Sequence, residues 1–266
     1  MPARDENDPE YSVMFFDTET VGSLDNMYEK GPNVEPYHPW TPLERQPHMI
    51  QLSFVVFHPK TYVIKDFYCG YVKLDNMELM TEEAFTHNHI SRETCEKHGR
   101  PILEVLRRFY AAYSRADRLI AHNIKFDRKI ILFECMRNRG DIRQHCPELG
   151  PLFKITKKPE AVEQYCTMWE TTKFCKLVKK NGQTGKPPRL IELYRILFKD
   201  DPPEPLHNAV IDTLVGLRCY LKYAEEKTVH NVKFGHMIKQ GFELAKLDPA
   251  LLAANLCSLP YEGRAF

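Results

Sequence analysis

The sequence predicts an α/β fold in which one mixed sheet carries helices on its faces. Two observations support this prediction. Three apolar or β-branched runs of strand length come first, at residues 11–16, 49–57 and 62–72. Segments with helical spacing then alternate with short apolar runs as far as residue 221. Strands followed by alternating helices and strands are typical of a single sheet covered by helices.

The first expected strand, residues 11–16, ends directly before an acid, Asp17. Residues 49–57 and 62–72 are separated by four residues and therefore predict a hairpin. Between these strands, residues 22–47 contain five prolines, which predict a long loop because proline interrupts both helices and sheet ladders.

The second half supplies helices and two further strands. The expected helices cover residues 101–113, 127–139 (ended by Gly140), 189–198 and 210–221, and the expected strands cover 118–121 and 164–169. Residues 1–10 are polar and are expected to form a disordered tail, residues 11–225 form one domain, and residues 226–266 form a helical appendage.

Composition limits the class of protein. No apolar run approaches the ~18 residues of a membrane span, and the first ten residues do not resemble a secretory signal. The eight cysteines contain no Cys-x-x-Cys pair, which favours reduced, buried thiols over disulfides. A zinc site from Cys135, His145 and Cys146 is the less favoured alternative. We expect an intracellular protein of a reducing compartment (cytoplasm or nucleus) that has no membrane partner.

Three separated segments carry acids in a pattern that suits phosphodiester chemistry. In residues 16–20, Asp17 and Glu19 are two apart at a strand end, so both carboxylates project from one face. Their repulsion would be relieved by a divalent cation, and hard oxygen ligands favour magnesium or manganese. A solvated Asp-x-Glu at a strand edge is the alternative for this segment alone.

The other two segments are residues 121–127 and 207–212. Asp127 opens a helix, where helix capping is the alternative role, and His122 alone is more typical of a structural histidine. Asp212 lies on an apolar helix and needs a partner. His207 is five residues earlier, ~140° away around an ideal helix, so it must lie in the preceding loop to share a site with Asp212.

The ordered set of motifs resembles the DnaQ-like 3′–5′ exonucleases of the DEDDh subtype. The matching residues are Phe16-Asp17-Thr18-Glu19-Thr20, then His122-Asn123-x-x-Phe126-Asp127, and His207 with Asp212 after four intervening residues. The resemblance covers residues 11–225. It implies a ribonuclease H-like mixed five-stranded sheet flanked by helices on both faces.

The resemblance also implies a mechanism. Asp17, Glu19, Asp127 and Asp212 would hold two Mg²⁺ ions, which Mn²⁺ can replace, ~3.5–4 Å apart. His207 would act as general base, and nucleoside 5′-monophosphates would leave the 3′ end of single-stranded nucleic acid. We expect DNA in preference to RNA, although the motifs act on the phosphodiester that both share. DNA repair, proofreading and RNA degradation are all compatible with these motifs.

Four residues are candidates for gripping the terminal nucleotide, namely Thr20, Val21, Asn123 and Phe126. Residues 173–189 are basic and predict a hairpin or loop that follows the phosphate backbone, with a solvated loop as an equal alternative. Two departures from the family pattern are residues 87–91, His-Asn-His-Ile-Ser, and the long loop at 22–47. The competing hypothesis is a nucleic-acid-binding or polymerase-accessory module without catalysis. A polymerase contact and a homodimer contact are both left open.

Overall fold

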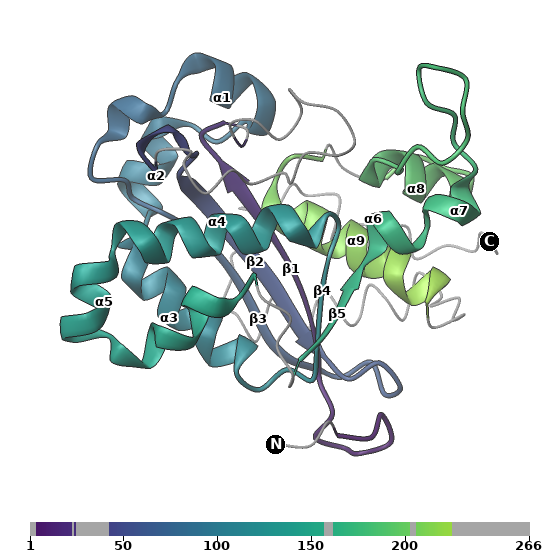
Figure 1. Cartoon of the computed structure of the whole chain (residues 1–266), viewed down its shortest axis with the longest axis horizontal. Helices are drawn as coiled ribbons and strands as arrows, with labels where there is room; N and C mark the ends of the chain where they lie inside the picture. The colour runs from purple at the N-terminus through teal and green to yellow at the C-terminus, as the bar shows by residue number, and fades with distance from the viewer. Residues whose placement is uncertain (1–3, 23, 25–42, 157–161, 203–205, 225–266) are drawn as a thin grey trace.

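The computed structural model describes residues 4–22, 24, 43–156, 162–202 and 206–224. A five-stranded sheet with the order β3-β2-β1-β4-β5 lies at its centre (Figure 1). The strands are β1 (Val13–Thr20), β2 (Met49–Phe57), β3 (Ile64–Tyr71), β4 (Arg118–Ala121) and β5 (Glu163–Cys166). The central strand β1 is antiparallel to β2 and parallel to β4, so the sheet is mixed, as predicted.

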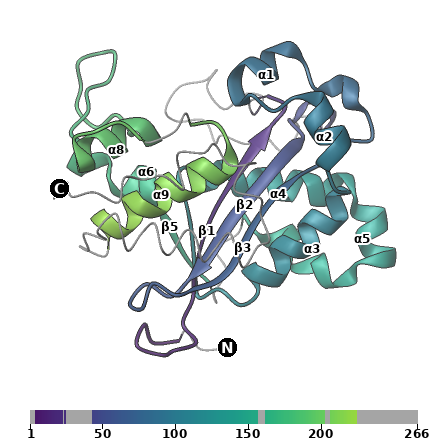
Figure 2. The same cartoon turned by 180° about the vertical axis from the view of Figure 1, so that it is seen from behind.

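Helices cover both faces of the sheet, which confirms the predicted fold class. Those before β5 are α1 (Glu82–Asn88), α2 (Arg92–His98), α3 (Ile102–Tyr113), α4 (Ile124–Arg137) and α5 (Arg139–His145). Those after it are α6 (Thr167–Glu170), α7 (Thr172–Cys175), α8 (Leu190–Phe198) and α9 (Ala209–Tyr223). Short 3-10 turns lie at Leu43–Arg45, Met77–Leu79 and Pro147–Lys154. Helix α4 lies in front of the sheet in Figure 1. Helix α9 lies on the opposite face, which is turned toward the viewer in Figure 2.

Two apolar cores, one on each face, are separated by β1. Met14 and Phe16 pack into the core that contains α3 and α4, whereas Val13 and Phe15 pack into the core that contains α8 and α9. This alternation follows from the two-residue repeat of a strand. It places the next odd-numbered side chains, Asp17 and Glu19, on the α9 face, and Thr18 on the α4 face.

Several predicted boundaries were wrong. Strand β1 continues past residue 16 to Thr20, and the strand expected at 164–169 ends at Cys166 and continues as α6. Cys166 pairs with Ala121, the last residue of β4, so the chain beyond it has no strand neighbour to bond with and turns into a helix. Gly140 lies inside α5 instead of ending the preceding helix. The short helices α1 and α2 were not predicted.

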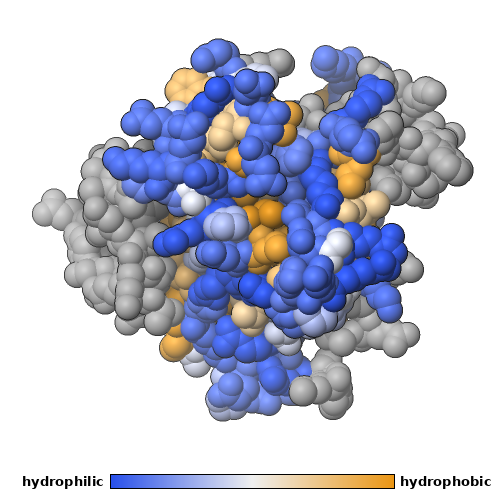
Figure 3. Space-filling view, turned by 90° about the vertical axis from the view of Figure 1, so that its left-hand side faces the viewer, coloured by the Kyte–Doolittle hydropathy of each residue, from blue (hydrophilic) through white to orange (hydrophobic). Residues whose placement is uncertain are grey.

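Residues 4–10, expected as a disordered tail, instead form turns held against the sheet. His58 Nε2 lies 3.1 Å from the carbonyl oxygen of Asp8, and Arg4 pairs with Asp117 at 3.3 Å. The expected appendage at 226–266 lies outside the described residues. No described helix has both the length and the apolar character needed to span a membrane. Figure 3 shows one side of the molecule, where hydrophilic residues dominate the surface and apolar ones show in small areas.

Candidate active site

The site begins where β1 loses its parallel neighbour. The pairing of β1 with β4 runs from Val13↔Arg118 to Phe15↔Ile120, and the chain then leaves β4 to enter α4. Backbone groups of β1 beyond this point need other partners. The carboxylate of Asp127, in the first turn of α4, takes the place of the missing strand. Its Oδ1 accepts from Thr18 N at 3.1 Å and from Thr18 Oγ1 at 2.8 Å.

The predicted acids converge from three elements of the fold. Asp17 and Glu19 lie on β1, Asp127 on α4, and Asp212 in the first turn of α9. Burial, together with repulsion from Asp127, Asp212 and Glu19, raises the pKa of Asp17 well above its ordinary value. Four acids scattered over the sequence therefore share one electrostatic environment.

The other three carboxyls also have raised pKa values. Burial and then repulsion from Asp212 and Asp127 raise the pKa of Glu19 to about 9. Burial raises the pKa of Asp127 to about 7, against the lowering effect of its Thr18 hydrogen bonds. Burial also raises the pKa of Asp212 to about 7, partly offset by the backbone N–H of His207. The site is thus a largely buried acidic cluster, and no lysine or arginine among the described residues lowers the pKa of its four carboxyls.

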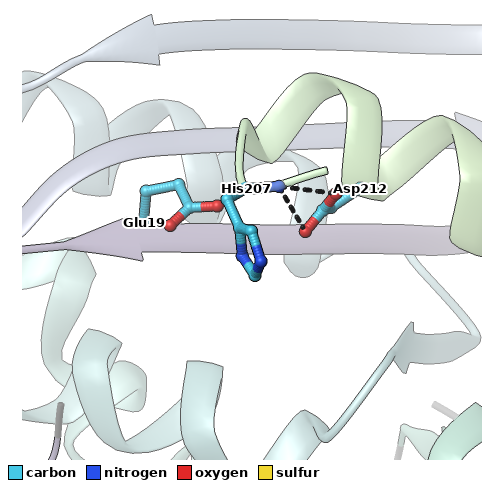
Figure 4. Close-up of side chains that lie close together, drawn as sticks. All are labelled: Glu19, His207 and Asp212. Atoms are coloured by element: carbon cyan, nitrogen blue, oxygen red, sulfur yellow. Dashed lines mark hydrogen bonds between the residues drawn. The ribbon is translucent and has the colours of Figure 1, made fainter. Parts of the chain in front are cut away.

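His207 lies in the loop directly before α9, as its spacing from Asp212 required. Its φ of 76° is a left-handed conformation, and its backbone N–H points at Asp212, 3.2 Å from Oδ1 and 3.4 Å from Oδ2. The side-chain ligand atoms of Glu19, His207 and Asp212 all lie within 4.8 Å of one another (Figure 4). The exposed imidazole therefore stands beside two acids of the cluster.

Gln51 is a site-supporting residue that the sequence reasoning missed. It lies opposite Glu19 in the β1–β2 pairing and is fully buried. Its Oε1 accepts from Ala209 N at 2.9 Å, and its Nε2 donates to Asn208 Oδ1 at 3.3 Å. The amide in the largely apolar run of β2 was the available signal, because a buried amide requires partners. Gln51 ties the strand of Glu19 to the helix of Asp212.

The donor set fits divalent cations. Carboxylate oxygens are the ligands that Mg²⁺ and Mn²⁺ prefer, and a cation would neutralise the charge that raises these pKa values. Among the described residues, the group formed by Glu19, His207 and Asp212 is the one cluster with metal-ligand spacing. Cys135, His145 and Cys146, the alternative zinc ligands, are not gathered in this way, and the seven described cysteines are free thiols.

The four candidates for nucleotide binding lie around the ends of β1 and β4. Thr20 is buried, and its hydroxyl donates to Gly22 O at 2.5 Å. Val21 and Phe126 are half-buried against the core on the α4 face. Asn123 precedes α4 in a left-handed conformation, with φ 71°, and its side chain makes no capping hydrogen bond. The role of these four residues in nucleotide binding stays a prediction.

The segment that departs from the family pattern contacts the end of β1. Asn88, at the end of α1, is buried and donates from Nδ2 to Thr20 O at 3.1 Å. Its Oδ1 accepts from Ile90 N at 3.0 Å, and Ser91 caps α2. The residues after α1 are thus fixed next to Thr20, on the rim of the acidic cluster.

His122 has a structural role, as the sequence favoured. Its Nε2 donates to Pro188 O at 3.1 Å, and its Nδ1 lies 3.0 Å from Thr167 Oγ1. Burial lowers the pKa of His122 to about 4, so the ring is neutral near pH 7. It joins the end of β4 to the start of α6 and to the segment before α8.

Comparisons with known proteins agree with this geometry. The model of an exonuclease family, RNase T, matches residues 14–220. A structure of a 3′-exonuclease that recognises the 3′ end of a histone mRNA stem-loop has a TM-score of 0.53 and 12% identity over 81% of this chain and 82% of that one. The nuclease domain of 3′hExo, a DEDDh family member bound to rAMP, gives the same score and identity over 92% of its length.

Exonuclease I of E. coli, in complex with a dA16 oligonucleotide, has a TM-score of 0.52 and 12% identity over 86% of this chain. The match covers 45% of that longer protein. A search of curated protein sequences finds no match. At such identities the likeness to these structures establishes the fold.

Proposed function

Because the chain belongs to the RNase T family of exonucleases, we propose that it is a metal-dependent 3′–5′ exonuclease of the DEDDh subtype. It would hydrolyse the terminal phosphodiester of single-stranded nucleic acid and release nucleoside 5′-monophosphates. The observation that carries the proposal is the convergence of Asp17, Glu19, Asp127 and Asp212 beside the imidazole of His207.

The four carboxylates would hold the cations. Asp212 lies close enough to Asp17 and Glu19 to raise the pKa of both, and Asp127 adds a fourth carboxylate from α4. Two bound Mg²⁺ ions would supply Lewis acidity, which acidifies a water and stabilises the departing 3′ oxygen. Thr18 fixes Oδ1 of Asp127 with two hydrogen bonds, and the backbone N–H of His207 is shared between the two carboxylate oxygens of Asp212. These contacts set the positions of the ligand oxygens before any cation binds.

His207 would act as the general base. Imidazole titrates near neutral pH, so its neutral form accepts a proton from water under ordinary conditions. Its left-handed backbone turns the side chain to stand beside Glu19 and Asp212 while its N–H bonds Asp212. The exposed ring can pass the accepted proton to solvent. The left-handed backbone and the hydrogen bond to Asp212 thus support this role.

The substrate is proposed to be a single-stranded 3′ end, with DNA ahead of RNA. The relatives named above were solved with rAMP and with dA16, and the acids act on the phosphodiester that both polymers share. Matched DNA and RNA oligonucleotides, incubated at equal concentration with Mg²⁺, decide the preference through their ratio of kcat/KM.

The test of the activity uses an oligonucleotide labelled at its 5′ end, with Mg²⁺ and with EDTA. We expect a ladder that shortens from the 3′ end with Mg²⁺ and no ladder with EDTA. His207→Ala should lower kcat about 10²–10⁴-fold, the range for a lost general base, with a much smaller change in KM. His145→Ala, which removes an exposed imidazole on α5, is the matched control and should behave as wild type.

Full activity in EDTA would refute the metal-dependent mechanism. Binding of the oligonucleotide without any shortening would instead favour the competing role of a binding or polymerase-accessory module. Equal losses in kcat and in substrate binding for His207→Ala would contradict the general-base role.

A further inference from the structure

Residues 171–191 form a basic surface outside the acidic cluster. They contain six basic residues and no acidic residue. The structure arranges them as α7, a hairpin closed by the pairing of Val178 with Thr184, and the first turn of α8. Lys179 N bonds Gln183 O at 2.7 Å, and Gly182 takes a φ of 82° at the turn. In Figure 1 the hairpin between α7 and α8 projects beyond the body of the fold.

Only part of this positive charge is compensated. Glu192 Oε1 forms ion pairs with Lys186 Nζ at 2.6 Å and with Arg189 Nη2 at 3.4 Å. The other four lysines are exposed and form no ion pair with any described residue. They are Lys173, Lys176, Lys179 and Lys180. Four uncompensated charges on α7 and the hairpin that follows it attract a polyanion such as a nucleic acid backbone.

An exposed aromatic residue lies two residues before this segment and close to α4, the helix that carries Asp127. Trp169, on α6, is 49% exposed, which is unusual for so large an apolar side chain. The ammonium of Lys125 lies 5.9 Å from the centre of its ring. Lys125 belongs to the first turn of α4, two residues before Asp127. The ring therefore stands beside the helical turn that presents an acid of the site.

The basic hairpin is attached at the same end of the sheet. The carbonyl oxygen of Pro188, at the base of the hairpin, accepts a hydrogen bond from the ring of His122, which directly follows β4. Thr167, two residues before Trp169, contacts the other nitrogen of that ring at 3.0 Å. His122, five residues before Asp127, thus connects the base of the hairpin to α6, the helix that carries Trp169.

We propose that Trp169 and the four exposed lysines of residues 173–180 together bind the nucleotides upstream of the terminal phosphodiester. The proposal rests on the proposed exonuclease function, because it assigns a path to the strand that leaves the active site. The indole would stack on a base, and the lysines would contact phosphates. Such contacts do not distinguish one base from another, so binding here is independent of sequence.

The experiment compares a long and a short substrate. Trp169→Ala should raise KM about tenfold for an oligonucleotide of about 15 nucleotides, the effect of one lost stacking contact. Because a dinucleotide has no nucleotides beyond the two that flank the terminal phosphodiester, its kcat/KM should stay within about twofold. Trp169→Phe, which keeps an aromatic face, should recover most of the affinity for the long substrate. An equal loss on both substrates would overturn the proposal, and so would no loss on either.

The lysines are tested through the salt dependence of binding. With oligonucleotide binding measured in EDTA, Lys179→Gln with Lys180→Gln should reduce the slope of log Kd against log salt concentration by about 1.4, or 0.7 per lost phosphate contact. Arg139→Gln with Arg143→Gln is the matched control, since it removes the same charge from the exposed surface of α5, at the opposite side of Figure 1. An equal change in the control would overturn the proposal.

Failure of the proposed exonuclease function gives a different result from failure of the strand-binding proposal. If the wild-type protein hydrolyses neither the oligonucleotide nor the dinucleotide, the exonuclease function is wrong. The binding measurement in EDTA then still tests whether the lysines bind nucleic acid. A Kd that does not change on their substitution would overturn that role.

Discussion

Gln51 Oε1 accepts a hydrogen bond from the backbone N–H of Ala209 at 2.9 Å, although the two residues are 158 positions apart in the sequence. Gln51 lies directly across from Glu19 in the sheet, and Ala209 begins the helix that carries Asp212. The other end of the same amide bonds Asn208. One buried side chain therefore sets the position of the third acidic segment relative to the first.

Gln51→Leu should impair catalysis more than folding. The substitution leaves Ala209 N–H without its buried partner, at a cost of about 1–3 kcal/mol in the free energy of unfolding. Because the start of α9 loses its fixed position, we expect kcat to fall with little change in KM. Chemical denaturation and steady-state kinetics measure the two effects. Gln51→Glu keeps an acceptor for Ala209 N–H and should lie between Gln51→Leu and wild type. Wild-type kcat in Gln51→Leu would contradict the positioning role.

Thr18→Val should weaken the hold on Asp127. It removes the 2.8 Å hydroxyl hydrogen bond but keeps the 3.1 Å backbone bond, so we expect a loss of about 1–2 kcal/mol in the free energy of unfolding. Nucleotide release should slow, since one ligand oxygen is less restrained. Thr18→Ser restores the hydroxyl and should restore the rate. A rate in Thr18→Ser as low as in Thr18→Val would point to packing instead.

Asp212→Asn should abolish nucleotide release yet stabilise the metal-free protein. Asp212 raises the pKa of Glu19 and of Asp17, and the amide keeps an acceptor for His207 N–H while removing the charge. The folded-state pKa values are raised, so in EDTA the wild type should lose stability as the pH rises from about 4 through the raised pKa values of about 7–9. Melting curves across this range should show a smaller loss for Asp212→Asn.

Added Mg²⁺ should reverse that loss in the wild type. A free ion concentration of 100 times Kd adds about 2.7 kcal/mol, which for a chain of this size raises Tm by about 5–10 °C. Asp212→Asn should show a much smaller rise. An equal rise of Tm in the two proteins would place the bound ions elsewhere.

His122→Gln should remove one source of acid sensitivity. The pKa of His122 is lowered in the folded state to about 4, so the unfolded chain binds the proton more readily between pH 6.5 and 4. The contribution of His122 to the free energy of unfolding therefore falls as pH falls through this window, by up to about 3 kcal/mol, opposite in sign to the effect of the acidic cluster. Glutamine can still donate to Pro188 O but does not titrate. Identical pH profiles of unfolding would show that His122 is not responsible.

Gly216→Ala should push α9 away from β1. An added Cβ would lie 2.3 Å from Phe15 Cζ, and such overpacking costs about 1–3 kcal/mol. Asp212 is one helical turn earlier on α9, so activity should fall together with stability. Gly150→Ala is the matched control, because its Cβ would meet no atom within 4 Å. A fully stable and active Gly216→Ala would mean that Phe15 can move at low cost.

The spacing of residues along the chain was enough to predict the α/β class and the approximate strands, and to single out five residues that the fold brings together beside β1. Alternation in β1 puts Asp17 and Glu19 on one face, and the five-residue interval excludes a helical site for His207 with Asp212. These conclusions depend on local periodicity, which the sequence contains directly. The boundaries of β5 and α6 were wrong because they depend on where β4 ends, which is a property of a neighbouring strand.

The supporting contacts were decided by the tertiary structure alone. Gln51 and Ala209, or Thr18 and Asp127, meet because the sheet order brings distant segments together, and no periodicity in the sequence records such a pairing. The chain thus specifies which groups can do the chemistry through their type and spacing. Their distances and raised pKa values arise only when burial removes water from the acids and repulsion between distant parts of the chain becomes strong.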